Sequence, residues 1–310
     1  MKTFPLGKRA VHRVGFGAMQ LPGRGAFGPP RDRAEALAVV RRAVELGVDH
    51  VDTAQYYGPA VANEVLRSAL YPYPEQLVLV TKVGAARDEQ GAWIPAQRPE
   101  QLRQGVLDNL RALKVDRLDV VNLRLAQKGG AAALLDEQLD AMVAMRDEGL
   151  IADIGLSNVD LDQLRRALER TEIVCVQNPY NLVDRGSAAV LHECTGRGIA
   201  FVPFFPLGAS FGRARVLGHP KVKAVAERLD VTPAQVALAW LLATAPNTLL
   251  IPGTASLEHL EENMGAGHIR LDDEALAVLD GLATDGAEAA RATRAGVAED
   301  GDAEDGDGDA

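Results

Sequence analysis

Apolar positions along the chain recur with two different spacings. From about residue 12 onward, short runs rich in β-branched residues alternate with longer segments whose apolar positions recur every three or four residues. The short runs indicate buried strands and the longer segments indicate amphipathic helices. The expected strands are residues 13–17, 49–53, 77–82, 118–123, 152–157, 173–177, 200–203 and 248–251. Expected helices include residues 33–46, 100–113, 134–148, 161–169, 233–244 and 257–264.

This alternation predicts an α/β protein whose strands are parallel and connected by helices. Eight such strands close most naturally into a (β/α)8 TIM barrel of about 250 residues. The alternative is a doubly wound open sheet that binds a dinucleotide. The glycine-dense stretch Gly15 to Gly28 lacks the GxGxxG spacing which that alternative requires after its first strand, so the barrel is favoured.

The pattern ends near residue 285. Residues 286–310 contain few bulky apolar side chains and many Gly, Ala, Asp and Glu residues. Such a segment cannot offset the entropy of ordering its backbone. We therefore expect a single-domain barrel over residues 1–285, followed by a disordered acidic tail over residues 286–310.

Charge and composition narrow the classes of partner. The formal net charge is −10, and the acidic tail accounts for more than half of it, since it holds eight acidic and two basic residues. No basic patch is evident, so we expect no nucleic-acid partner. No apolar run is long enough to span a membrane and residues 1–10 lack a signal-peptide core, which favours a cytoplasmic protein. The two cysteines, Cys175 and Cys194, do not indicate disulfides. We also expect no metal centre, and a monomer, although the sequence leaves the oligomeric state open.

Candidate chemistry lies at the carboxyl ends of three expected strands. Asp52 lies at the end of the second strand and Tyr57 just after it, Lys82 ends the third and Arg124 ends the fourth. In a barrel these ends converge on one mouth. A phenol has a pKa near 10, so it donates a proton at neutral pH only if a cation stabilises the phenolate. Lys82 can supply that cation, and Asp52 can supply its counter-charge.

Each of these side chains also has an ordinary structural interpretation. An Asp at a strand end often forms a turn, a Tyr often packs in the core, and a Lys is often a solvated surface charge. Their joint position at the same end of consecutive strands favours the chemical interpretation.

Five motifs together resemble the aldo-keto reductase family. They are Asp52-Thr53-Ala54 with Tyr57-Gly58, Val80-Thr81-Lys82-Val83, Ile154-Gly155-Leu156-Ser157-Asn158, Val176-Gln177-Asn178, and Ile251-Pro252-Gly253-Thr254 with Glu262-Asn263. They occur in the family's order over roughly residues 3 to 282. The resemblance implies that Tyr57 is the proton donor, that Lys82 lowers its pKa and that Asp52 holds Lys82.

The resemblance also implies a nicotinamide cofactor. Ser157, Asn158 and Gln177 match positions that hydrogen-bond the nicotinamide carboxamide, and Phe204 matches the aromatic residue that stacks on its ring. Pro206 and Leu207 follow in the same motif. For the adenosine end the matching residues are Gly253, Thr254, His259, Glu262 and Asn263. Gly253 and His259 stand where the family usually has a Lys and an Arg. We expect NADPH, because Gly-Thr loops also occur in branches that use it.

Arg124 departs from the family, which usually has a His that hydrogen-bonds the substrate carbonyl. An Arg stays charged at any working pH, so it can polarise a carbonyl but donates protons poorly. The proton transfer then falls to Tyr57. The alternative for Arg124 is a salt bridge to an acidic residue of a loop at the rim.

The segments containing Arg124, Pro29-Pro30, Tyr71-Pro72-Tyr73 and Phe204-Phe205 resemble a bacterial branch that includes pyridoxal reductases. This implies reduction of pyridoxal to pyridoxine, with Met19, Gln20 and Trp93 as candidate substrate contacts. Trp93 is expected in the loop after the third strand, where it either walls the substrate pocket or simply packs. Other possibilities are a general aldehyde, ketone or sugar reductase, or a nicotinamide-binding regulatory subunit with little turnover.

Overall fold

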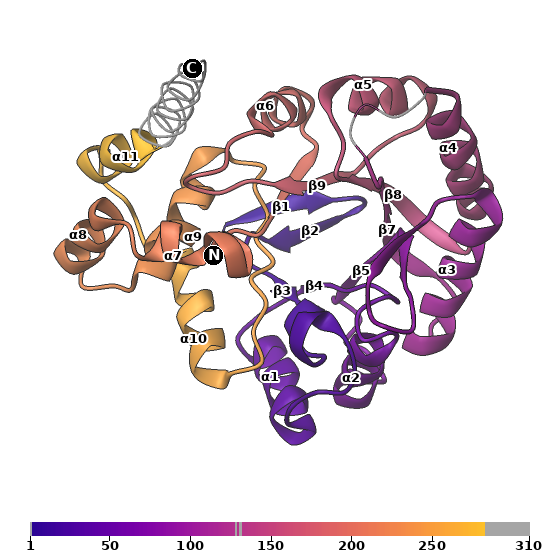
Figure 1. The fold of residues 1–310 in the computed structure, drawn as a ribbon, viewed down its shortest axis with the longest axis horizontal. Helices are drawn as coiled ribbons and strands as arrows, with labels where there is room; N and C mark the ends of the chain where they lie inside the picture. Colours follow the sequence, from indigo (N-terminus) through magenta and orange to yellow (C-terminus); the bar gives the residue numbers. More distant parts are fainter. Residues whose placement is uncertain (1, 128, 130–131, 283–310) are drawn as a thin grey trace, which may run out of the picture.

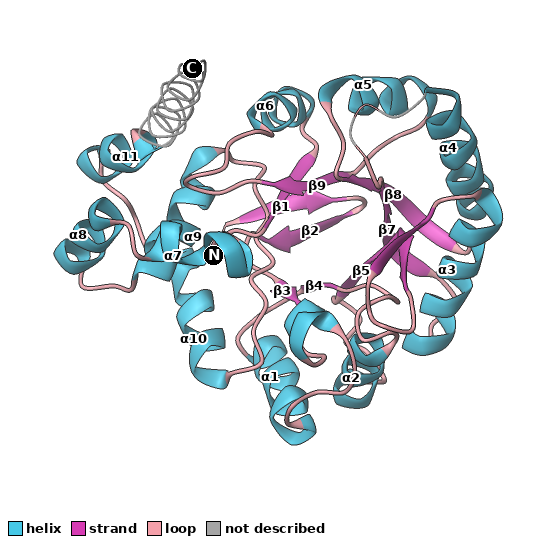
Figure 2. Ribbon diagram, viewed as in Figure 1, coloured by secondary structure: helices cyan, strands magenta, loops and turns pink. Residues whose placement is uncertain are grey.

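Parallel strands form a curved sheet with helices packed around its outside (Figures 1 and 2). The structure is a computed structural model that describes residues 2–127, 129 and 132–282. Neighbouring strands follow chain order, and every pair along the path is parallel. The strands are β3 (Phe16–Gly17), β4 (His50–Asp52), β5 (Val78–Arg87), β7 (Leu118–Arg124), β8 (Ile151–Ser157), β9 (Cys175–Pro179) and β10 (Ala200–Phe204).

Residues 247–251 close the ring between β10 and β3. On one side the Leu249 amide donates to the Phe201 carbonyl at 2.9 Å; on the other the Leu250 amide donates to the Arg13 carbonyl at 2.8 Å. The predicted eighth strand is therefore reduced to isolated parallel bridges. Prolines, which cannot donate a ladder hydrogen bond, stand at 246 and 252 and limit its length. The predicted TIM barrel is confirmed, with this irregular closing segment.

The expected helices all form, with ends that differ by at most two residues from their predicted positions. They are α1 (Arg33–Glu45), α3 (Pro99–Leu113), α4 (Ala132–Asp147), α5 (Leu161–Arg170), α9 (Pro233–Thr244) and α10 (Leu257–Gly265). The structure adds α2 (Val61–Leu70), α6 (Ala188–Arg197), α7 (Ala209–Leu217), α8 (Pro220–Leu229), α11 (Asp273–Asp280) and the short turns η1 (Ala18–Gln20), η2 (Arg24–Ala26) and η3 (Ala266–His268). In α9, Thr232 and Gln235 form a capping box ahead of Pro233, which explains its sharp start.

An N-terminal hairpin covers the amino end of the barrel (Figure 1). β1 (Thr3–Leu6) and β2 (Arg9–His12) pair antiparallel. Leu6 and Val11 of the hairpin are buried in one apolar cluster with residues of the barrel interior such as Val120. With this end sealed by apolar side chains, the opposite end is where the barrel can receive a ligand.

Three further expectations concern the chain as a whole. The predicted domain boundary at residue 285 and the predicted tail, 286–310, lie outside the described residues. Cys175 and Cys194 are buried and free, as expected. Within the described residues, every helix is too short or too polar to cross a membrane.

Candidate active site

The register of the sheet aligns three predicted site residues across neighbouring strands. Arg124 on β7 is the partner of Ser157 on β8, and Ser157 is the partner of Gln177 on β9. Lys82 pairs in the same way with Asn122, two residues before Arg124. Because paired residues of parallel strands point to the same face, these side chains gather at one mouth of the barrel.

Asp52 and Lys82 form a buried ion pair at this mouth. Lys82 Nζ contacts Asp52 Oδ1 and also donates to the Thr53 carbonyl at 3.0 Å. Both residues are at most 4% exposed. Charges so far from water are tolerated only when they are paired and hydrogen-bonded. Lys82 has three N–H donors, and with two of them engaged one remains for a further acceptor.

The Tyr57 ring lies against the ammonium group of Lys82, whose Nζ is 5.0 Å from the ring centroid. Burial raises the pKa of Tyr57, and the Asp52 carboxylate raises it further. The guanidinium groups of Arg124 and Arg87 act in the opposite direction and lower the pKa of this phenol. Tyr57 is therefore protonated at neutral pH and available as a donor, with two cations placed to stabilise the anion it would leave.

Arg124 is half-buried and has no acidic partner among the described residues. Its Nη1 donates to Ser157 Oγ at 3.2 Å, and its guanidinium carbon lies 5.3 Å from the centroid of the Phe204 ring. The alternative of a rim salt bridge therefore finds no support in the part of the chain that the structure describes. The cation instead faces the barrel mouth.

A second cation, Arg87, was not anticipated from the sequence. Its guanidinium donates to the backbone carbonyls of Gly91, Gly25, Ala26 and Tyr56. It also lies 3.3 Å from the centroid of the Trp93 ring. In the sequence, Arg87 could have been noticed only as a basic residue five positions after Lys82. The structure shows that both residues belong to one strand, because β5 extends to Arg87.

Trp93 lies in a strand, which corrects the expectation of a loop. It begins β6 (Trp93–Ala96), which pairs antiparallel with the end of β5 so that Trp93 is the partner of Arg87. The ring of Trp93 makes edge contacts with Tyr56 and Tyr57, at centroid distances of 5.4 and 6.5 Å. It is nevertheless 46% exposed, so it packs against Tyr57 and also borders open space.

The residues expected at the nicotinamide carboxamide lie together at the mouth, but their hydrogen bonds were not foreseen. Gln177 Nε2 donates to the second carboxylate oxygen of Asp52, while Gln177 Oε1 is buried and has no hydrogen-bond partner among the described residues. Asn158 adopts a left-handed backbone and donates its side-chain amide to the Leu125 carbonyl at 2.9 Å. The free buried acceptor on Gln177 suits an N–H donor such as a carboxamide.

Phe204, the aromatic residue expected to stack on the nicotinamide ring, lies beside Arg124 at the same mouth. Phe204 ends β10 half-buried, and Phe205 meets it edge-on with centroids 5.0 Å apart. Pro206 and Leu207 follow half-buried, and Leu207 packs against the main core.

The residues expected at the adenosine end surround the start of α10. Ser256 caps this helix by accepting from the His259 amide, while the Ser256 amide donates to Thr254 Oγ1 at 3.1 Å. Thr254 and Asn263 are buried and His259 is exposed. Glu262 accepts a hydrogen bond from the Thr232 hydroxyl. A helix start of this kind attracts phosphate groups through its free amides and its dipole.

Gly253 and Gln20 meet at the same end of the site. A Cβ atom on Gly253 would lie 2.6 Å from the Gly17 carbonyl oxygen and 3.4 Å from Gln20 Cγ. Gln20 is exposed, and Met19 is half-buried against the main core. Although Gln20 was expected at the substrate, the structure thus places it beside the loop expected to bind the cofactor.

The sequence and the fold match those of known proteins. Residues 13–284 match the Aldo/keto reductase family. The chain belongs to this family. It is 49% identical to pyridoxine 4-dehydrogenase from Escherichia coli over 91% of this chain and 99% of that protein.

Two solved structures of an aldo/keto reductase from Klebsiella pneumoniae have the same fold. One is a complex with NADP and acetate, with a TM-score of 0.76, 29% identity, and coverage of 91% of this chain and 95% of that one. The other is a complex with NADPH, with a TM-score of 0.74, 29% identity, and coverage of 91% and 94%.

A buried polar network lies directly behind the candidate catalytic residues of this chain, and it too was missed from the sequence. Asn109 of α3 accepts from the Thr81 hydroxyl at 2.7 Å and from the Asn63 amide at 2.9 Å, and it donates to Gln55 at 3.0 Å. Asn63 in turn accepts from the Thr53 hydroxyl at 2.7 Å. Thr53, Gln55 and Thr81 are near neighbours in sequence of Asp52, Tyr57 and Lys82, so Asn109 connects the segments that carry these residues.

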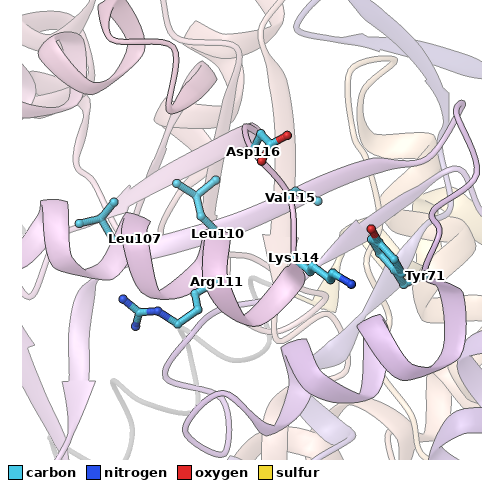
Figure 3. Close-up of a pocket in the computed structure, with 7 residues that line it drawn as sticks. All are labelled: Tyr71, Leu107, Leu110, Arg111, Lys114, Val115 and Asp116. Atoms are coloured by element: carbon cyan, nitrogen blue, oxygen red, sulfur yellow. The ribbon is translucent and has the colours of Figure 1, made fainter.

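The reductase also has an open groove of about 520 Å³ at the opposite end of the barrel (Figure 3). It lies where α2 and α3 end, before the strands that follow them, and Lys114 Nζ is 4.6 Å from the centroid of the Tyr71 ring. Its lining residues are Tyr71, Leu107, Leu110, Arg111, Lys114, Val115 and Asp116. None of these belongs to the mouth described above, so this groove is separate from the candidate active site.

Proposed function

We propose that this aldo/keto reductase transfers hydride from NADPH to an aldehyde or ketone, with pyridoxal, reduced to pyridoxine, as the preferred substrate. The observation that carries the proposal is the buried Asp52–Lys82 ion pair against the Tyr57 ring. A protonated phenol with adjacent cations is a general acid for an oxygen that becomes an alkoxide.

In this proposal Tyr57 donates the proton to the substrate oxygen. Lys82 supplies a positive charge beside the Tyr57 ring, and Asp52 holds Lys82 in place through the ion pair. Arg124 polarises the carbonyl from the side of Ser157. Because Arg124 cannot give up a proton at working pH, Tyr57 alone performs the proton transfer.

The residues present fit a nicotinamide dinucleotide. Gln177 Oε1 is a buried acceptor at the mouth with no hydrogen-bond partner in the described part of the chain, and a carboxamide N–H would satisfy it. Ser157 and Asn158 would hold the same group, Phe204 would stack on the ring, and Pro206 and Leu207 would border it. Gly253, Thr254, His259, Glu262 and Asn263 would hold the adenosine end at the start of α10. When bound, the dinucleotide supplies the hydride.

The substrate assignment is supported by the relative that is a pyridoxine 4-dehydrogenase. It is also supported by the half-exposed Trp93, which offers a planar apolar wall next to Tyr57. Met19 and Gln20 are the other proposed substrate contacts, and Gln20 is the one that lies nearest the loop proposed to bind the cofactor.

Steady-state NADPH oxidation with pyridoxal and a panel of simple aldehydes, ketones and sugars tests this function. We expect turnover of order 1 per second or faster with pyridoxal, in the usual enzymatic range. Tyr57→Phe keeps the ring and removes the donor, so it should abolish reduction while the Kd of NADPH stays unchanged. Undiminished turnover in this variant would exclude Tyr57 as the donor. Much slower turnover of every carbonyl would instead support a nicotinamide-binding regulatory subunit.

We further propose that the protein acts in the cytoplasm as a monomer, with neither nucleic acid nor a membrane as its partner. The acidic net charge of −10 supports the absence of a nucleic-acid partner. Light scattering after size-exclusion chromatography tests the monomer, and a dimer mass would contradict it.

A further inference from the structure

Two guanidinium groups border the candidate active site without forming an ion pair to any described carboxylate. Arg124 has a serine hydroxyl as its hydrogen-bond acceptor, and Arg87 is held by backbone carbonyls. Both charges act on Tyr57. The Asp52 carboxylate at this mouth is engaged by Lys82 and Gln177. Asp88, next to Arg87, accepts from the amides of the following turn.

Half-buried cations that lack a counter-charge favour a ligand that brings one. Partial burial weakens the hydration of each guanidinium charge, so an anionic group at the mouth stabilises both. The two cations differ in how much of their donor capacity is used. Arg87 makes four hydrogen bonds to carbonyls, whereas Arg124 makes one to Ser157 Oγ. Arg124 therefore has the N–H donors to offer.

The shape of these free donors defines the anion. A guanidinium group presents two parallel N–H bonds that match two neighbouring oxygens. The first of these oxygens is the substrate carbonyl oxygen, which must also reach Tyr57. The second oxygen must then lie next to the carbonyl on the same molecule. The aromatic surroundings provided by Tyr56, Trp93 and Phe204 suit a flat ring that carries both oxygens.

We propose that Arg124 selects aromatic aldehydes that carry an ionised hydroxyl group ortho to the carbonyl, by binding both oxygens with one guanidinium group. The inference rests on the proposed reductase function and specifies the feature of the substrate that is recognised. Pyridoxal has this arrangement, since its ring hydroxyl is adjacent to its aldehyde. Arg87 supports the selection at longer range through its charge.

A pair of isomers isolates this feature. 2-Hydroxybenzaldehyde and 3-hydroxybenzaldehyde have the same composition and differ in the distance between the two oxygens. The isomer ratio is kcat/KM for the 2-isomer divided by kcat/KM for the 3-isomer. We expect this ratio to be at least about ten times higher in the wild-type protein than in Arg124→Gln, a factor equivalent to one charged hydrogen bond. The ratio within each protein cancels any general loss of turnover, and the comparison of that ratio between proteins cancels the intrinsic reactivity of the aldehydes.

Further variants test which arginine recognises the substrate. Arg124→Gln should lower the isomer ratio to nearly the value found in Arg124→Ala, and Arg87→Gln should lower the ratio less. Arg111→Gln removes an exposed guanidinium group from α3, far from the mouth, and should leave the ratio unchanged. A larger loss in Arg87→Gln than in Arg124→Gln would overturn the assignment to Arg124.

A spectroscopic measurement tests the same contact without turnover. Phenolate absorbance of 2-hydroxybenzaldehyde, bound to the protein with NADP⁺, should develop at lower pH than in free solution for wild type and revert toward the free value in Arg124→Gln. Equal isomer ratios in wild type and Arg124→Gln, with reduction intact, would overturn this inference and leave the proposed reductase function standing. A raised Kd of NADPH in Arg124→Gln with an unchanged isomer ratio would assign the guanidinium to the cofactor and likewise overturn it.

Discussion

The carboxylate of Asp52 joins Lys82 and Gln177. One of its oxygens is paired with Lys82 Nζ, and the other accepts from Gln177 Nε2. This second contact orients the Gln177 amide so that its oxygen is left as the free acceptor. A single buried carboxylate thus positions a group proposed to act on the substrate oxygen and a group proposed to bind the cofactor.

Asp52→Asn should damage both stability and turnover. It removes the counter-charge of a lysine that is 4% exposed, and breaking a buried pair in this way costs about 3–5 kcal/mol. We expect a lower urea midpoint and a fall in kcat of at least about a hundredfold, in the range attributed to acid–base groups. Asp108→Asn is a suitable control, because its ion pair with Arg111 is at the surface. Equal effects of the two substitutions would contradict the role of Asp52.

Gln177→Leu should weaken cofactor binding more than it slows catalysis. The leucine keeps the side-chain volume but removes both the acceptor and the hydrogen bond to Asp52. Loss of one hydrogen bond of about 1.4 kcal/mol corresponds to about a tenfold rise in the Kd of NADPH. Fluorescence titration with NADPH measures this change. An unchanged Kd would place the carboxamide elsewhere.

Stability should depend on pH in the alkaline range through the buried tyrosines. Burial raises the pKa of Tyr57 and of Tyr56 above their ordinary value. Their contribution to stability is therefore complete below about pH 10, the pKa of an unfolded tyrosine, and is lost as the pH rises beyond it. Urea unfolding on either side of this value measures the loss. Tyr57→Phe, which has no phenol to ionise, should show a smaller loss than wild type; an identical profile would contradict this account.

Asn109→Ala should reduce kcat although Asn109 lies in a helix behind the barrel wall. The substitution leaves the Thr81 hydroxyl and the Asn63 amide without their partner, and each buried polar group left unsatisfied costs about 1–3 kcal/mol. Because these residues adjoin Lys82 and the Tyr57 segment, we expect a lower kcat while the KM for NADPH is unchanged. Gln104→Ala, at an exposed position of the same helix, is the control. A pure loss of stability, with kcat intact in the folded fraction, would limit Asn109 to a structural role.

Much of the fold could be predicted because the strand and helix periods are local properties of the sequence. Helix α9 begins and ends as expected, since Thr232, Pro233 and Gln235 define its start by local hydrogen bonds. The N-terminal hairpin escaped prediction, because β1 and β2 have only four residues each and are stabilised by packing against the barrel interior. The closing segment at residues 247–251 has apolar residues typical of a strand, but its pairing depends on two edges that are distant in sequence.

The sequence by itself determined the barrel and the gathering of Asp52, Tyr57, Lys82 and Arg124 at one mouth of it, because strand order and direction follow from the alternation of elements. The tertiary structure alone decided how these groups are paired. Gln177 meets Asp52 across 125 positions of sequence, and Arg87 stacks on Trp93 through a strand pair. Arg124 has no acidic partner among the residues that the structure describes. Such contacts depend on side-chain geometry between separate strands, and no local pattern of residues encodes that geometry.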